Sequence, residues 1–420
     1  MFWYKYCYLS VALILFLSQS LFAQKLTLQQ SIEEALAHNP EIMKGKQTVK
    51  AAKAKLWEGI SPENPKLFAE FEGIPWSRHS LSNYGERKVG FVQEFEFPLI
   101  YYFKGRWHQF EIRCVSAEYL LLQNKVISEV KKKFYKVLLL EKQLQLYKDI
   151  KQLTQELYRK TQIRVKAGES PYYDELKMKV DLAEVENRAL AIRKQYEIAL
   201  NDLALFLGRK HAKSIEIEGE LLYSPISLNQ DSLQRVALES HPHLKETQEH
   251  VNQKKATRNL SWIGLIPNIE IRCFQQEFQY EPLPKVWGAE IGVSLPLWFF
   301  LKDQGKASST IHELEAAKWQ LELDKRKVIF KVKEAFSKLI LAEKQVQNYQ
   351  ENVLQEVEEL VRIATISYEQ GEMGYLDVAE ALRTLNRTKA GYSEALFKYL
   401  AAQADLERAI GVNFIDIENY

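Results

Sequence analysis

Cysteine is scarce in this chain of 420 residues, which contains only Cys7, Cys114 and Cys273. Three cysteines are too few for the disulfide framework that holds small secreted domains together. Cys7 falls in an N-terminal leader. For Cys114 and Cys273 the alternatives are one bridge or two free buried thiols, and the free thiols are favoured.

An excess of charge of one sign is also missing, because 57 Lys and Arg face 55 Asp and Glu. This balance does not indicate a nucleic-acid or an acidic partner. The sequence has no HExxH, GxSxG, P-loop or glycine-rich dinucleotide motif, so neither an enzyme activity nor a cofactor is predicted. The stretch His241-Pro242-His243 is the nearest approach to a metal motif. Further ligands are missing nearby, so we expect a capping or surface role and no metal site.

Long apolar runs are missing beyond the first 24 residues, so no spanning helix is predicted there. The first residues contain Lys5, an apolar core of about ten residues and the small residue Ala23, which together predict a signal peptide over residues 1–23. A membrane anchor is the alternative, but its core would need about 20 apolar residues. No cysteine follows the cleavage region, so a lipid anchor is not expected.

The chain contains an internal repeat. Residues 125–147 and 327–349 are identical at 13 of 23 positions, with an offset of 202. The motif Gly-Glu-x-x-Tyr-x-Asp occurs at Gly168 and again at Gly371, 203 positions later. These matches predict a duplicated protomer with a first repeat over 24–224 and a second over 225–420.

Each repeat contains two segments in which polar and apolar residues alternate, which predicts strands near 66–75, 86–98, 267–278 and 286–297. One face is apolar, and the other carries mostly acids: Glu70, Glu72, Glu94, Glu96, Glu270, Arg272 and Glu290. Strands of this length suit a tilted crossing of an outer membrane. Four strands cannot close a barrel alone, so closure requires more than one protomer. Two protomers would supply eight strands, whose interior is filled by side chains, and three would supply twelve, which leave room for a passage. A soluble sheet beside a helical bundle is the alternative.

The remaining sequence is helical in pattern. Residues 28–60 and 230–262 are expected to form helices that break at Asn39 and His241, each followed by proline. Long hairpins are expected over 103–207 and 304–410, with apolar residues at coiled-coil spacing and bends at Gly168 and Gly371. A helix of about 65 residues would be about 100 Å long.

Three segments resemble bacterial outer-membrane efflux factors of the TolC type. They are the opening KLTLQQSIEEALAHNPEIMKGKQTVKAAKAKLWEG, the strand-to-helix stretch VGFVQEFEFPLIYYFKGR and the turn RVKAGESPYYDEL. The resemblance extends over the mature chain. Within the family, the NPE opening, SPENPKL and AGESPYYDE are most similar to the subgroup that serves heavy-metal and related cation pumps.

The resemblance implies a passive homotrimeric conduit with a twelve-stranded barrel in outer-membrane lipid and a twelve-helix tunnel in the periplasm. A periplasmic adaptor and an inner-membrane pump of the RND type would be its partners. Heavy-metal cations or drugs would be its substrates. The alternative function is a non-porous periplasmic coiled-coil scaffold.

The resemblance also implies roles for residues near the bends. Asp377 and Glu380, six and nine positions after Gly371, would form the periplasmic gate, where six carboxylates would raise one another's pKa. The first repeat has Asp174 but Lys177 at these positions, so the gate role does not transfer to it. The expected adaptor contacts are Gly168, Glu169, Asp174, Gly371 and Glu372.

Overall fold

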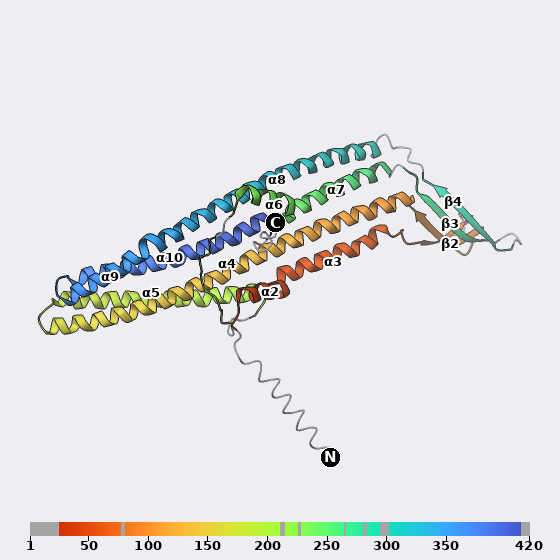
Figure 1. Cartoon of the computed structure of the whole chain (residues 1–420). Coiled ribbons are helices and arrows are strands. Elements are labelled where there is room, and N and C mark those ends of the chain that lie inside the picture. The colour runs from red at the N-terminus through yellow and green to blue at the C-terminus, as the bar shows by residue number, and fades with distance from the viewer. Residues whose placement is uncertain are drawn as a thin grey trace, which may run out of the picture. The chain divides into compact units, whose positions relative to one another are not determined.

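The structure is a computed structural model that describes residues 25–76, 80–210, 215–225, 228–263, 266–279, 284–294 and 302–412. These residues form a mainly helical protein with four antiparallel strands, as predicted (Figure 1). The expected signal peptide lies outside the described residues. Among the helices described, none combines the length and apolar character that a membrane crossing requires.

The shorter helices break where the sequence predicts. Helix α2 spans Leu28–His38 and α3 spans Pro40–Ile60. Asn39 lies between them, and its Oδ1 accepts the backbone N–H groups of Glu41 and Ile42, at 2.8 and 3.4 Å. In the second repeat, α6 (Gln230–Ser240) ends before the buried His241, and α7 (Pro242–Ile263) begins at the following proline. Proline suits this first position because its missing N–H would have no partner there.

The long helices differ between the repeats. Helix α4 (Pro98–Lys166) is continuous over 69 residues, and α5 (Tyr172–Phe206) follows the bend. Helix α4 begins before the expected residue 103 because Pro98 can occupy the first helical turn. In the second repeat, α8 (Lys302–Asn348) is followed by a π-helical turn, η2 (Tyr349–Val353), and then by α9 (Leu354–Glu369) and α10 (Tyr375–Ile410). The coiled-coil pattern does not predict η2.

The strands form one antiparallel sheet in the order β1-β2-β3-β4. Their bounds are β1 Lys66–Glu72, β2 Glu86–Phe95, β3 Ile269–Phe278 and β4 Val286–Val293. The central pair, β2 and β3, joins the two sequence repeats. β1 ends before residue 75 because Gly73 has a φ of 70°, outside the extended region. β2 ends at Phe95, shortly before α4 begins at Pro98. The last expected residues of the fourth strand, 295–297, lie outside the described residues.

The chain divides into two compact units, and each contains segments of both repeats. The first comprises Met1–Lys44, Leu121–His241 and Val328–Tyr420, and the second comprises Gly45–Leu120 and Pro242–Lys327. The core of the first unit includes the predicted seam of both long hairpins: Val126, Val130, Phe134, Val137, Val328, Val332 and Leu339 are all buried. The second unit contains the sheet and a smaller helical core at Val251, Leu314, Ala317 and Leu321.

Candidate functional site at the hairpin turns

Both hairpins bend at a glycine in the left-handed conformation. The φ angle is 78° at Gly168 and 79° at Gly371, where a side chain would be strained. The residue after each glycine closes the preceding helix: the N–H of Glu169 donates to the carbonyl of Arg164 (2.9 Å), and that of Glu372 donates to Ser367 (2.8 Å). The repeated motif therefore encodes the same bend twice.

The two predicted gate acids lie in the first turns of α10 and are exposed. Asp377 Oδ2 accepts the backbone N–H of Gly374 at 3.1 Å, so this carboxylate also caps the helix. Glu380 is three positions further, on the same side of the helix, and its Oε2 lies 3.7 Å from an Arg383 nitrogen. The protomer thus presents both carboxylates at its surface.

A largely buried polar network lies beside these acids. Asp181 of α5 accepts one hydrogen bond from the hydroxyl of Tyr375 and another from Arg383, at 2.7 Å for the latter. The Asp181 side chain is 13% exposed, and Tyr375 is 3% exposed. The network joins α5 of the first hairpin to α10 of the second, and Arg383 extends it to Glu380.

Both groups that donate hydrogen bonds to Asp181 have raised pKa values. Burial and the hydrogen bond to Asp181 raise the pKa of Tyr375 well above its usual range, so its hydroxyl remains a donor. The same carboxylate raises the pKa of Arg383. Asp181 and Arg383 were not predicted from the sequence. The available signal was Tyr375, which belongs to the repeated motif.

A second connection joins α4 to α9. The Arg164 guanidinium donates to the carbonyl of Tyr368 at 2.9 Å and lies 4.8 Å from the centre of its ring. The Tyr368 and Thr161 hydroxyls are 3.0 Å apart and buried. Lys160 and Glu369 add an exposed ion pair at 2.6 Å, which contributes little. The two hairpins are therefore connected at two levels near their bends.

The acids of the first bend are arranged differently. Glu169 and the corresponding Glu372 are both exposed, and Glu169 lies 3.7 Å from Arg164. Asp174 and Lys177 lie in the first turns of α5, and both are half-buried. The first bend therefore presents one acid and one base where the second presents two acids.

The sheet register puts most of the predicted lumen residues on one face. Glu70 is opposite Lys88, and Arg272 is opposite both Val92 and Glu290. Residues directly opposite one another share a face, and this face carries Glu70, Glu72, Glu86, Lys88, Glu94, Glu270, Arg272 and Glu290. Glu96 lies beyond the end of β2 and pairs with Lys104.

Cations partly neutralise this acidic face. Lys88 lies 3.0 Å from Glu86 and 3.6 Å from Glu72. Arg272 lies 3.2 Å from Glu270 and 4.0 Å from Glu290. Glu86 and Lys88 were not predicted to lie on this face, although their alternate spacing with Glu94 is the signal that places them there. Acids still outnumber bases, but their place in a lumen remains a prediction.

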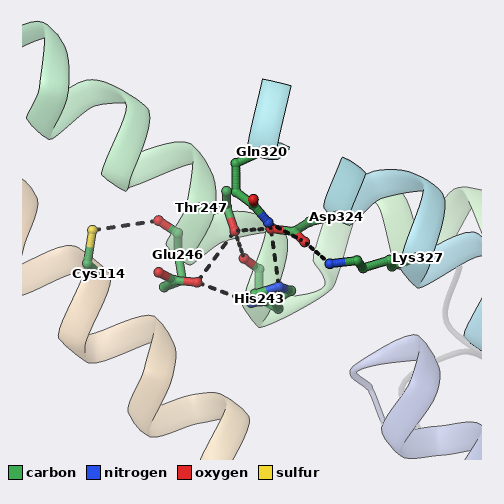
Figure 2. Close-up of polar contacts among 7 residues, drawn as sticks. All are labelled: Cys114, His243, Glu246, Thr247, Gln320, Asp324 and Lys327. Atoms are coloured by element: carbon green, nitrogen blue, oxygen red, sulfur yellow. Dashed lines mark hydrogen bonds and ion pairs between the residues drawn. The ribbon is translucent and has the colours of Figure 1, made fainter. Parts of the chain in front are cut away.

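His243 lies in a polar cluster of the second unit (Figure 2). Its Nδ1 is 3.1 Å from Glu246 and its Nε2 is 3.5 Å from Asp324, so both ring nitrogens face carboxylates. Asp324 is buried, which by itself raises its pKa, but hydrogen bonds from Gln320 and the nearby His243 and Lys327 lower the pKa overall. Among the described residues, no group of His, Cys, Asp and Glu is arranged to hold a metal ion.

Both remaining cysteines are free. Cys114 is buried, and its Sγ lies 3.6 Å from the carbonyl oxygen of Glu246. Burial raises the pKa of Cys114 to about 12, so this thiol remains protonated and is a poor metal ligand at neutral pH. Cys273 is half-buried in β3, so only one of the two thiols is fully buried as expected.

The fold is similar to that of solved outer-membrane proteins. VceC of Vibrio cholerae is 17% identical, with a TM-score of 0.76 over 92% of this chain and 96% of that chain. The CmeC outer membrane channel of Campylobacter jejuni is 15% identical, with a TM-score of 0.77 over 91% of this chain and 85% of that chain. At these identities the likeness is one of fold.

Sequence comparison gives a relative and a family. The cobalt-zinc-cadmium resistance protein CzcC of Cupriavidus metallidurans is 25% identical over 248 residues, which are 59% of this chain and 58% of that protein. The match therefore spans little more than half of the relative. The family model for outer membrane efflux proteins matches both repeats, over residues 31–209 and 233–412. The chain belongs to the outer membrane efflux protein family, which assigns it to the outer membrane with a periplasmic helical extension.

Proposed function

We propose that this protein is the passive outer-membrane channel of a tripartite efflux system and that it acts as a homotrimer. The described part of each protomer supplies four strands, so three protomers would supply the twelve of a closed barrel. Apolar side chains on the sheet face opposite the acids support this proposal. Leu67, Trp287 and Ile291 are 87%, 78% and 74% exposed in the single protomer, as lipid-facing or subunit-facing residues would be.

The gate is the part of the proposal that the geometry supports most directly. Asp377 and Glu380 are exposed on one side of α10, directly beside a network that holds α10 to α5. Three copies would bring six carboxylates to one opening. Such a ring attracts cations and repels anions.

The proposed cargo is a heavy-metal cation, with drugs as the alternative. Two observations support a metal cation as the cargo: the name of the relative CzcC, a cobalt-zinc-cadmium resistance protein, and the excess of acids on one face of the sheet. The proposed partners are a periplasmic adaptor, in contact with the two bends, and an inner-membrane pump of the RND type. The exposed Tyr172 and Leu376 beside the bends offer apolar surface for such an adaptor.

Planar-bilayer recording tests the gate. The double variant Asp377→Ala, Glu380→Ala should raise the closed-state conductance of the purified protein, because it removes the charged ring. Asp174→Ala is the matched control, since it removes the acid at the sixth position after the other turn glycine. An unchanged conductance in the double variant, or an equal rise in the control, would remove the gate role.

Fractionation and resistance assays test the rest of the proposal. A channel should appear as heat-resistant trimers in the outer-membrane fraction, whereas a soluble periplasmic monomer would favour the coiled-coil scaffold. Cells that lose the protein should become sensitive to cobalt, zinc or cadmium ions, and complementation should restore resistance. Sensitivity to drugs alone would favour the alternative cargo.

A further inference from the structure

The second hairpin contains a π turn at a position where the first hairpin is α-helical. This turn, η2, lies between α8 and α9 and ends at Val353, whose φ and ψ of −120° and −41° depart from helical values. The matching stretch of the first repeat lies inside α4, which is α-helical from Pro98 to Lys166. A π turn contains one more residue than an α turn.

The residue count of the two repeats differs by one across this region. Tyr147 and Tyr349 end the aligned segments, which are offset by 202 positions, whereas Gly168 and Gly371 are offset by 203. The first repeat therefore takes 21 steps from its tyrosine to its turn glycine, and the second takes 22. Relative to the first repeat, the second has one extra residue between Tyr349 and Gly371.

Burial locates the extra residue. Before η2, buried residues of the two seams correspond at the offset of 202, as for Val126 with Val328 and Val137 with Leu339. After η2, two pairs correspond at the offset of 203, Thr154 with Val357 and Thr161 with Ala364, whereas the buried Leu157 has the exposed Leu360 at that offset. The change falls within the stretch that contains η2, so this turn takes up the inserted residue.

If α8 continued into α9 as one unbroken α-helix, the residues after η2 would no longer face the buried seam. Each residue turns an α-helix by about 100°. Without the π turn, the extra residue of the second repeat would therefore rotate α9 by that angle about the helix axis. Val357, Ala364 and Tyr368 would then leave the buried seam. Tyr368 would also lose its contacts with Thr161 and Arg164, which connect the two hairpins.

We propose that η2 is a positioning element: it absorbs a one-residue insertion, keeps α9 and the start of α10 in phase with the first hairpin, and is the preferred bending point of the second hairpin. Only the link from this phase to a gate at Asp377 and Glu380 rests on the proposed function. The alignment of the buried residues of α9 with those of the first hairpin follows from burial and residue count alone.

The surroundings of η2 support bending there. None of its residues is buried. Gly391 of α10 leaves room for the Tyr349 ring, since a Cβ at that glycine would lie 2.5 Å from the tyrosine hydroxyl. Gln350 donates to the Tyr392 hydroxyl at 2.8 Å, an exposed contact that can break and reform. Kinks in long helices commonly occur at such π turns.

Paired one-residue deletions test the positioning role. Deletion of the exposed Asn352 should allow α8 and α9 to join as one α-helix while Val357 and Ala364 stay in the seam. Deletion of Asp149, which corresponds to Asn352 at the offset of 203, should rotate Thr154 and Thr161 out of the seam. We expect the Asn352 deletion to leave the melting temperature and the oligomeric state in detergent unchanged. The deletion in α4 should lower the melting temperature and disrupt the oligomer. Equal damage in both variants, or greater damage from the Asn352 deletion, would overturn the proposal.

Hydrogen exchange tests the bending role in the same samples. Amides at 349–357 should exchange faster than those at 147–154 in the unaltered protein, and the Asn352 deletion should slow them by about tenfold or more. Equal exchange in the two stretches, or no slowing after the deletion, would refute bending at η2. Neither measurement requires a conducting pore, so the inference can fail or stand separately from the gate.

Discussion

The hydroxyl of Tyr375 should hold the second hairpin against the first. In Tyr375→Phe the ring stays in its buried position, and only the hydrogen bond to Asp181 is lost. A hydrogen bond to a charged group contributes about 1.5–3 kcal/mol. The lower part of this range applies because Asp181 keeps its bond to Arg383, whose side chain is half-exposed.

A loss of about 2 kcal/mol in each protomer corresponds to about a 30-fold shift in an equilibrium between closed and open states. This shift appears in full only if opening separates α10 from α5. We therefore expect Tyr375→Phe to increase the time that the purified channel spends open in planar bilayers. The melting temperature in detergent should also fall.

The repeat supplies a matched control. Tyr172 occupies the same motif position in the first bend but is 62% exposed, so Tyr172→Phe should change neither property. The reasoning would be refuted if the two variants behaved alike. Alkaline pH gives a further check: because the pKa of Tyr375 is raised above 10, its stabilisation should persist through pH 10 and be lost only as the folded protein deprotonates at higher pH.

Three further outcomes are expected. Asn39→Ala removes the cap of α3 and the hydrogen bond to the carbonyl of Phe206; it should lower stability by about 1–2 kcal/mol in thermal or denaturant unfolding. Gly371→Ala places a side chain at a φ of 79° and should lower the free energy of unfolding by about 1–2 kcal/mol. The same unfolding measurement on a variant with a substitution at the exposed Met373 is the control. Cys114, whose pKa is raised to about 12, should react with maleimide at pH 8 more slowly than Cys273, as mass spectrometry of the labelled protein would report; equal rates would contradict its burial.

Sequence alone predicted the fold class and family because the repeat supplies each signal twice. Alternating residues mark the strands of both halves, and seams such as Val126 with Val328 mark the long helices. Asn39 next to Pro40 was sufficient to predict a helix break, since both ends of that break are satisfied locally. Local chemistry also predicted the bends, where the left-handed conformation favours glycine.

Tertiary structure alone decided which distant residues meet. Asp181 and Arg383 are 202 positions apart, and nothing in their local patterns pairs them before the hairpins pack. The register of β2 against β3 likewise determines that Arg272 and Lys88 share a face with the acids. The π turn arises for the same reason: the sequence contains the extra residue, but the packing of α9 against the first hairpin determines where the helix must take it up.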